Sequence, residues 1–299
     1  MRGPEVRRPP AHTELNASHP APLLLMPRLA LLLTTVIWGA TFPATKAALE
    51  QITPLSFLLL RFFIGTLLVL AWLAASRRRL HYDRAVLKAS ALTTVFLFLG
   101  YLLQTVGLEY TTASNSAFLT ALYVIFVPLL LMRIDRRVVL ATVIAVVGLW
   151  LLIKPSAALN VGDLMTLGCA LAFAGHIICL ERYTRQVDAP SLLVWQMVAM
   201  TLLFLPAPWL EGVPAGSFAP TTVLLIGLGV TGVLATLAFA VQMWAQQLVP
   251  AQQVALLFAS EPAYAAWLSW YFLGEMLDPQ GWIGSALILL AVVIGAFGG

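Results

Sequence analysis

The chain has 299 residues, of which 61% are hydrophobic and 10% are charged, and its formal net charge is +4. Soluble domains carry about 25% charged residues, so this composition excludes a soluble globular protein and predicts an integral membrane protein. The two cysteines, Cys169 and Cys179, fall on different faces of one apolar segment. We therefore expect no disulfide, no metal site and no cofactor.

The first 27 residues differ from the rest of the chain. Residues 1–27 are rich in proline and polar side chains, which predicts a disordered N-terminal tail. Met26 is a second candidate for the first residue of the protein, because "MPRLALLL" reads as a natural opening.

Apolar stretches long enough to cross a membrane follow in series. A spanning helix needs about 20 mainly apolar residues. The pattern therefore predicts an all-α membrane protein with ten transmembrane helices. We expect them at residues 29–49, 54–75, 86–107, 112–132, 137–153, 163–181, 190–210, 220–246, 250–273 and 279–298.

The distribution of Lys and Arg predicts the orientation of these helices. With the N-terminus inside, fourteen Lys and Arg residues lie on the inner side, and only Lys46 and Lys154 lie outside. Since inner loops carry the excess of basic residues, we expect a multi-pass protein of the cell (cytoplasmic) membrane with both termini cytoplasmic. Topology alone accounts for the basic excess, so no nucleic acid is implied. The expected partners are a small-molecule substrate and membrane lipid, and the protein is expected to be a monomer or a homodimer.

The two halves of the chain share weak sequence similarity. "TPLSFLLL" at Thr53 resembles "APSLLVWQ" at Ala189, which lies 136 positions later, and Gln104 matches Gln242 at an offset of 138. A nearly constant offset indicates an internal repeat.

The repeat predicts how the helices are organised. We expect one five-helix unit over residues 28–155 and a second over residues 160–299. Because five is odd, the second unit enters the membrane from the opposite side. Such inverted-topology repeats are typical of secondary transporters, whose substrate site lies near the midplane between the halves.

Four segments make a family recognisable. "WGATFPATK", "LRF", "GLEYTTASNSAFL" and "SEPAYAAWLSWYFLGE" resemble the drug/metabolite transporter superfamily, EamA type. The resemblance implies a ten-helix carrier that moves small metabolites, often amino acids, outward. The sequence departs from the family pattern at one place. The family usually repeats a Gly-Glu pair after the fourth helix, but this stretch reads "LLLMRIDRR", so Glu275 has no counterpart in the first repeat.

Polar side chains recur at helical spacing within several spans and predict a central polar cavity. On the first helix, for example, Trp38 and Thr41 share one face. For any single hydroxyl, or for His176, the alternative is a hydrogen bond that holds two packed helices together. The candidate substrate-binding residues are Trp38, Thr41, Tyr101, Gln104, Ser116, Thr120, Tyr123, His176, Gln242, Glu261 and Tyr264.

Two buried charges stand out within the predicted spans. At 1.5 Å of rise per residue, Arg61 lies roughly 10 Å below the outer face and Glu261 lies roughly 15 Å deep. Charges inside a membrane usually face a cavity or a partner, and the long side chain of Arg61 could reach Glu261. This pair could couple transport to protons or a counter-substrate, with Tyr264 bonded to Glu261, or it could be purely structural. We expect Pro43, Pro128 and Pro262 to interrupt their helices.

A carrier is the leading functional hypothesis, and three alternatives remain. The cavity could export lipophilic drugs that stack on Trp38, Trp195, Trp244 or Trp267. A membrane-embedded enzyme lacks support, because neither H-E-x-x-H nor G-x-S-x-G occurs. A channel would repeat a filter-forming loop, and none is evident.

The segment "GLGVTG" (227–232) matches a nucleotide-binding pattern. Because it lies inside an apolar predicted helix, it indicates close helix packing instead.

Overall fold

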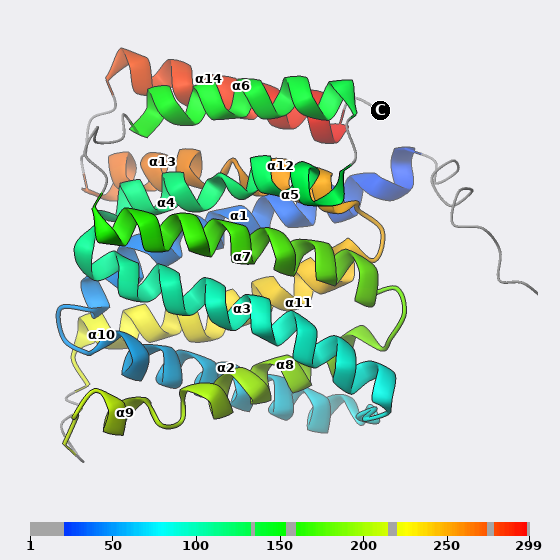
Figure 1. Cartoon of the computed structure of the whole chain (residues 1–299), viewed down its shortest axis with the longest axis vertical. Helices are drawn as coiled ribbons and strands as arrows, with labels where there is room; N and C mark the ends of the chain where they lie inside the picture. Colours follow the sequence, from blue (N-terminus) through cyan, green and yellow to red (C-terminus); the bar gives the residue numbers. More distant parts are fainter. Residues whose placement is uncertain (1–20, 133–134, 154–159, 215–219, 274–277, 298–299) are drawn as a thin grey trace, which may run out of the picture.

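The computed structural model describes residues 21–132, 135–153, 160–214, 220–273 and 278–297, and their regular structure is entirely helical (Figure 1). The helices lie side by side with roughly parallel axes. They are α1 (Ala21–Ala48), α2 (Pro54–Ser76), α3 (Arg84–Tyr110), α4 (Ala113–Ala121), α5 (Tyr123–Leu131), α6 (Arg136–Ile153), α7 (Val161–Tyr183), α8 (Ala189–Phe204), α9 (Ala207–Leu210), α10 (Thr222–Leu228), η1 (Gly229–Leu234), α11 (Ala235–Gln246), α12 (Ala251–Phe258), α13 (Glu261–Leu273), α14 (Pro279–Val292) and η2 (Val293–Phe297), where η marks a π-helical segment.

The predicted all-α membrane fold is confirmed. Within the described residues, nine helical segments are long and apolar enough to cross a membrane. The remaining expected span, 250–273, consists of α12 and α13, and each of these is too short to cross alone. α1 begins at Ala21, earlier than the expected residue 29, so the last part of the expected tail is helical. Residues 1–20 lie outside the described part of the chain.

The packing of the helices follows the two repeats. The most extensive contacts join α3 to α7, α1 to α11, α2 to α8 and α6 to α14. In the two repeats, α1 corresponds to α7, α2 to α8, α3 to α11 and α6 to α14. The α1–α11 and α7–α3 pairs are therefore equivalent, and each of the other two pairs joins a helix to its own counterpart. The repeats therefore meet along the whole bundle, as expected for an inverted repeat of five spans.

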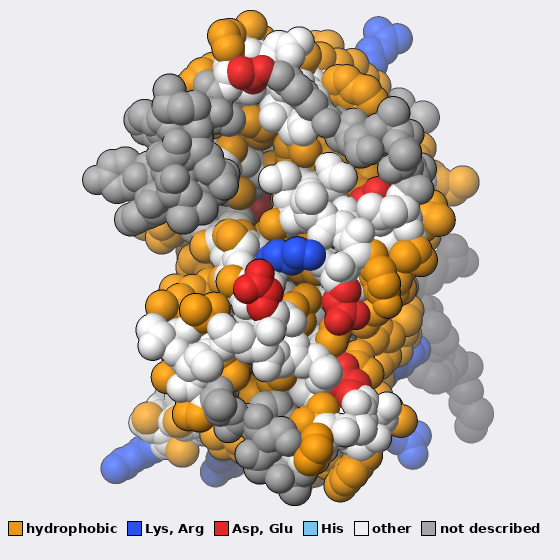
Figure 2. Space-filling view, turned by 90° about the vertical axis from the view of Figure 1, so that its left-hand side faces the viewer, with side chains coloured by type: hydrophobic (Ala, Val, Ile, Leu, Met, Phe, Trp, Pro, Cys, Tyr) orange, Lys and Arg blue, Asp and Glu red, His pale blue; other side chains and the backbone are white. Residues whose placement is uncertain are grey.

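The two ends of the bundle differ in charge. The first and last described residues lie at the same end (Figure 1), which we call the terminus end. Figure 2 views the opposite, far end, where acidic side chains surround one central basic side chain. Among the described residues, the far end holds Lys46, whose Nζ donates to the carbonyl oxygens of Leu108 and Thr111. The terminus end holds Arg28, Arg77, Arg78, Arg79, Arg84, Lys88, Arg136, Arg137, Arg182 and Arg185.

Small residues allow the helices to approach closely. A Cβ on Gly284 would lie 2.5 Å from the carbonyl oxygen of Gly148 on the facing helix. A Cβ on Gly232 would meet Ile64 at 3.1 Å. The segment "GLGVTG" lies in α10 and η1 rather than at a strand-to-helix turn. Gly227 and Gly232 approach Ala48 and Ile64 closely, as the packing interpretation expects, whereas Gly229 has open space beside it.

Two spans are broken near their centres. α12 ends at Phe258, whose carbonyl would otherwise bond the residue four positions later, which is Pro262 and has no N–H. A tight turn at Ala259 and Ser260 follows, and Ala263 N donates to Ser260 O at 3.0 Å. Pro262 thus interrupts its helix as expected.

The other two prolines behave differently. The break between α4 and α5 comes at Leu122, whereas Pro128 lies inside α5. Pro43 lies within the continuous α1, so the expected interruption there is not observed. A helix can continue past a proline when neighbouring helices hold its course and only one backbone hydrogen bond is lost.

The two breaks meet at the centre of the molecule. α12 packs against α5, and α13 packs against α4, so the two broken spans run beside each other. Tyr123 and Glu261 are the first residues after the breaks, and they are 138 positions apart in the sequence. Pseudo-equivalent backbone turns from the two repeats therefore face one another at mid-depth.

Candidate functional site

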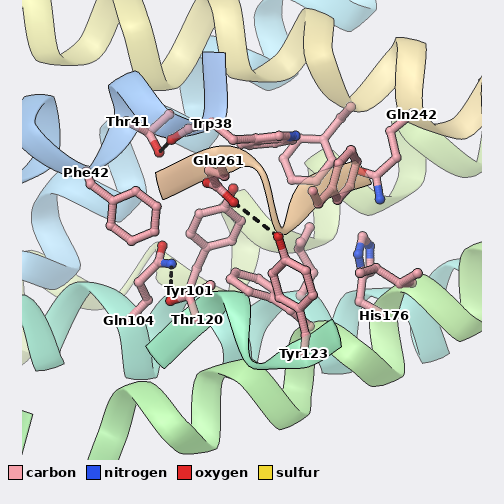
Figure 3. Close-up of a pocket in the computed structure, with 15 residues that line it drawn as sticks. Trp38, Thr41, Phe42, Tyr101, Gln104, Thr120, Tyr123, His176, Gln242 and Glu261 are labelled. Carbon is pink, nitrogen blue, oxygen red and sulfur yellow. Dashed lines mark hydrogen bonds between the residues drawn. The ribbon is translucent and has the colours of Figure 1, made fainter. Parts of the chain in front are cut away.

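A buried cavity lies where the two broken spans meet α1, α3, α7 and α11 (Figure 3). It encloses about 60 Å³, so it holds little more than water in this conformation. Its lining residues are Trp38, Thr41, Phe42, Leu97, Tyr101, Gln104, Thr120, Tyr123, Phe173, His176, Ile177, Phe239, Gln242, Phe258 and Glu261.

One carboxylate reaches the cavity. Glu261 opens α13, is 7% exposed, and accepts a hydrogen bond of 3.2 Å from the hydroxyl of Tyr123 on α5 (Figure 3). The remaining residues of the lining include no other acidic side chain and no Lys or Arg. The contact between Tyr123 and Glu261 therefore joins the two repeats at the one acidic point of the cavity.

Two glutamines lie toward opposite ends of the cavity. Gln104 lies near the far end of α3, and its Nε2 donates to Thr120 Oγ1 at 3.2 Å. Gln242 lies near the terminus end of α11, and its Nε2 donates to Gln246 Oε1 at 2.9 Å. Gln246 in turn donates to the carbonyl oxygen of Ile177 at 2.9 Å. Each glutamine is thus held in place by a hydrogen bond to a residue of its own repeat.

Aromatic rings form much of the cavity wall. The centroids of Trp38 and Phe239 lie 4.7 Å apart in an edge-to-face arrangement, and those of Tyr101 and Phe173 lie 5.3 Å apart. Such pairs prefer this geometry because the ring edge is positive and the face is negative. Trp38 Nε1 is buried without a hydrogen-bond partner, so it can donate to a bound molecule.

His176 contributes to the wall from α7. Its Nε2 lies 2.9 Å from the side-chain amide nitrogen of Gln196 on α8, and the ring meets Phe239 edge-on at 6.1 Å. The contact with Gln196 agrees with the packing interpretation of this histidine. His176 nevertheless also borders the cavity, so the two interpretations are compatible.

Comparison with known sequences identifies the family. The sequence model of the EamA-like transporter family matches residues 25–154 and again residues 160–296, which together cover nearly the whole chain.

The chain belongs to the EamA-like transporter family.

Similar proteins agree with this assignment. An "Uncharacterized transporter" of Archaeoglobus fulgidus is 34% identical over 272 residues, covering 89% of this chain and 84% of the relative. The "Uncharacterized transporter YwfM" of Bacillus subtilis is 29% identical over 289 residues, covering 89% and 92%. One crystal structure superposes with a TM-score of 0.75 over 92% of this chain and 99% of its own, at 16% identity. That structure supports the fold alone.

The structure brings together nine of the eleven expected site residues of this EamA-family chain. Ser116 and Tyr264 lie outside the lining. Ser116 is fully buried in α4, and its hydroxyl has no hydrogen-bond partner. Tyr264 is partly buried, and its ring lies 6.2 Å from that of Trp267. The hydroxyl that bonds Glu261 comes from Tyr123, because the break directs Glu261 across the repeat interface rather than along its own helix.

Arg61 and Glu261 do not form the contact that the sequence allows. No salt bridge joins them, although both side chains lie in the described part of the chain. Arg61 is 3% exposed, and its guanidinium carbon lies 4.2 Å from the ring centroid of Tyr101 and 5.1 Å from that of Phe62. Tyr101 lines the cavity and Arg61 does not. The arginine is therefore held by aromatic faces beside the cavity.

Sequence reasoning missed the apolar part of the EamA-family cavity. In an apolar span, a cavity-facing Phe cannot be told from one that faces lipid. The internal repeat carries a usable signal, because the offset of 138 relates Tyr101 to Phe239 and Thr120 to Phe258. The missed residues are Phe42, Leu97, Phe173, Ile177, Phe239 and Phe258.

Proposed function

We propose that this EamA-family chain is a secondary transporter that exports small metabolites, such as amino acids, by alternating access. The observation that carries the proposal is the cavity at the crossing of two broken spans, one from each repeat. We assign these repeats to residues 28–155 and 160–299. In inverted-repeat transporters, broken helices near the midplane form the substrate site, and each repeat gates one side.

The chemistry of the lining supports a small amphipathic substrate. A charged amino group suits Glu261, the single carboxylate of the lining. Amide and indole N–H groups of Gln104, Gln242 and Trp38 suit acceptor oxygens, and the aromatic wall suits an apolar side chain.

The alternative of lipophilic drugs receives less support. Of the four tryptophans expected to stack on such compounds, only Trp38 is among the lining residues. Trp195 donates its Nε1–H to the carbonyl oxygen of His81 at 2.8 Å, and Trp244 is 47% exposed on the outer surface of α11.

Glu261 is the group that we assign to coupling. It lies at the break between α12 and α13, where a movement of one repeat relative to the other would change the access of the carboxylate to water. A carboxylate that exchanges its proton on one side and then the other links substrate movement to a proton gradient. A counter-substrate amine at the same carboxylate would give obligatory exchange instead.

We propose that both termini are cytoplasmic and that the protein resides in the cytoplasmic membrane. The terminus end holds ten described basic residues, whereas the far end holds Lys46. The positive-inside rule assigns the basic end to the cytoplasm. A reporter fused after Arg78 should read cytoplasmic, and one fused after Lys154 should read as outside. The reverse pattern would refute this orientation.

The transport proposal is tested with purified protein in proteoliposomes. Uptake is measured across a panel of amino acids and other small metabolites, with and without a proton gradient. We expect saturable uptake of at least one amine-bearing metabolite, increased by the gradient. Flux that rises linearly with concentration would indicate a channel, and uptake of lipophilic dyes alone would favour the drug-export alternative.

A further inference from the structure

A second, larger hollow lies on the outside of the bundle at the terminus end. It lies between the end of α2, the beginning of α8 and the last turns of α11, and encloses about 610 Å³. That volume is within the usual range of small-molecule sites, about 300–1,000 Å³. We call it the α2–α8–α11 cleft. None of its lining residues belongs to the lining of the central cavity.

The cleft opens to the surroundings of the bundle. Three of its large apolar side chains are well exposed: Trp72 is 44% exposed, Leu237 is 49% and Trp244 is 47%. They lie on α2 and on α11, which is the last part of the span Thr222–Gln246, and both of these spans are long and apolar enough to cross a membrane. At that depth the surrounding solvent is lipid, so a hollow with apolar walls is filled by hydrocarbon rather than by water.

Polarity changes along the cleft. Leu68, Val69 and Leu193 form its apolar part, whereas Arg78, Asp188 and Gln247 lie at the boundary with the loops. From Leu68 to the end of α2 at Ser76, the helix rises roughly 12 Å at 1.5 Å per residue. An elongated ligand with an apolar tail and a polar head fits this gradient. Trp72 and Trp244 suit the boundary, where tryptophans are enriched.

Arg78 supplies a cation at the polar end. α2 ends in a left-handed residue, Arg77 (φ 51°), and the chain turns so that the Arg78 guanidinium lies 5.8 Å from the Trp72 ring centroid. A non-glycine residue rarely adopts this conformation except at a helix end. Among the described residues, Arg78 forms no ion pair with a carboxylate. Its charge is therefore available to an anion.

The acidic residue of the cleft is engaged elsewhere. Asp188 Oδ2 accepts from Ser191 N at 2.9 Å and lies 3.6 Å from His81 Nδ1. Burial alone would raise the pKa of Asp188, but the Ser191 hydrogen bonds and the nearby His81 hold it below its usual value. Because Asp188 is committed to the start of α8, it leaves Arg78 free to bind a phosphate.

We infer that the α2–α8–α11 cleft is a binding site for one anionic phospholipid from the leaflet at the terminus end. The acyl chains lie along Leu68, Leu193 and Leu237, and the phosphate lies against Arg78. A basic side chain at the boundary of a spanning helix attracts the anionic headgroups of nearby lipids, and Arg78 is the one basic residue in the lining of the cleft. The inference does not depend on what the central cavity transports.

The cleft also borders a helix of the central cavity. Met243 faces the cleft, while its neighbours Phe239 and Gln242 face the cavity from the same helix. A lipid seated in the cleft therefore packs against the outer side of α11. Its occupancy stabilises the position of the helix that carries Gln242.

Native mass spectrometry of the full-length protein tests the inference. The protein is incubated in mixed micelles with phosphatidylglycerol or phosphatidylcholine of matched chains, and the retained lipid is counted. We expect phosphatidylglycerol to be retained in preference to phosphatidylcholine. Arg78→Ala should lower that retention about fivefold, corresponding to about 1 kcal/mol for one interfacial arginine. The matched control Arg79→Ala should leave it unchanged, since Arg79 is exposed and lies outside the cleft.

A second pair of variants tests the apolar part. Ala240→Trp fills the cleft from an exposed position on α11 and should remove the retained lipid. Leu234→Trp, on an exposed position outside the cleft, should not. Equal retention of the two lipids, equal effects of Arg78→Ala and Arg79→Ala, or normal retention by a folded Ala240→Trp variant would each overturn the inference. Transport defects in Ala240→Trp without loss of lipid would assign the cleft to substrate entry instead.

Discussion

The break between α4 and α5 and the break between α12 and α13 occupy equivalent places in the two repeats, but they present different chemistry to the cavity. Tyr123 and Glu261 each follow a break, and Thr120 and Phe258 each precede one. The first repeat supplies a hydroxyl donor and a small polar side chain, whereas the second supplies a carboxylate and a phenyl ring. Both repeats thus contain the backbone turn, but only the second repeat carries a charged side chain, Glu261, directly after it. The asymmetry, rather than the symmetry, is where we expect the function to reside.

The largest effect on transport should follow from removing the charge of Glu261. Glu261→Gln keeps the shape of the side chain but cannot ionise, so gradient-driven transport should fall by about a hundredfold, comparable to losing a proton-transfer group. Exchange of substrate at equilibrium should persist. The measurement is uptake in proteoliposomes across pH, at matched protein abundance.

Glu109→Gln serves as the matched control, because Glu109 is an exposed carboxylate near the far end of α3. It should transport like the unmodified protein. Wild-type driven transport by a well-expressed Glu261→Gln variant would contradict the assignment of Glu261 to coupling.

A stability effect should distinguish two equivalent glycines, one from each repeat. A Cβ on Gly39 would lie 2.9 Å from the carbonyl oxygen of Glu261 and 3.2 Å from Ala265 N, and backbone cannot easily move. A Cβ on Gly175 would meet the Phe96 ring at 2.5 Å, and a side chain can rotate away. Gly39→Ala should therefore cost about 1–3 kcal/mol and Gly175→Ala should cost less. Thermal unfolding in detergent measures both, and the opposite order would show that the packing of α1 on α13 is not tight.

A smaller effect is expected from the two glutamines. Gln104→Leu and Gln242→Leu each remove one hydrogen-bonding group from the cavity, so each should weaken apparent substrate affinity about fivefold, corresponding to about 1 kcal/mol. Protein abundance should change less than affinity. Concentration dependence of uptake gives the affinities. Unchanged values in both variants would mean that the glutamines only pack against Thr120 and Gln246.

The smallest effect concerns the beginnings of α2 and α8. The first turn of α2 is capped by Glu211, which is distant in sequence and whose carboxylate accepts from Leu55 N and Ser56 N at 2.8 and 2.9 Å. In α8 the cap is Asp188, the residue directly before the helix. Because the pKa of Asp188 is lowered in the fold, its contribution is present above its usual pKa of 3.8 and is lost as pH falls through the folded value.

Asp188→Asn should accordingly flatten the acid end of the stability profile while costing under about 1 kcal/mol at neutral pH, since the side chain is partly exposed. Thermal unfolding above and below pH 3.8 provides the measurement. An identical acid slope in the variant and the unmodified protein would show that Asp188 is not the titrating group.

Much of the fold could be predicted from the sequence, because the signals are strong and local. The ten apolar stretches follow directly from the thickness of the bilayer, and Pro262 marks the break in the ninth span. The break at Leu122 could not be predicted, since no proline or glycine lies at that position. The two broken spans pack against each other there, which is a tertiary contact that local sequence does not reveal.

The candidate site was predictable only where polar side chains mark it. Gln104, Gln242, Tyr123 and Glu261 are unusual in apolar helices, and all four line the cavity. The pairing of Arg61 could not be predicted, because depth along a helix gives no information on rotation about it. Arg61 faces Tyr101 on α3 instead of Glu261 on α13.

The burial of Arg61 among aromatic rings has a consequence for biogenesis. A lone arginine at mid-helix adds about 2.5–3.5 kcal/mol to the cost of inserting a segment from the translocon. α2 is otherwise strongly apolar, so it can still partition into the bilayer during synthesis. The ring that covers Arg61 arrives with α3, the very next segment, and Phe62 is adjacent in the chain. Glu261 emerges 138 residues after Tyr123, which is then already in the membrane to receive it. Each buried charge thus waits only briefly for its partner, and the nascent first repeat need not depend on the second to shield its own arginine.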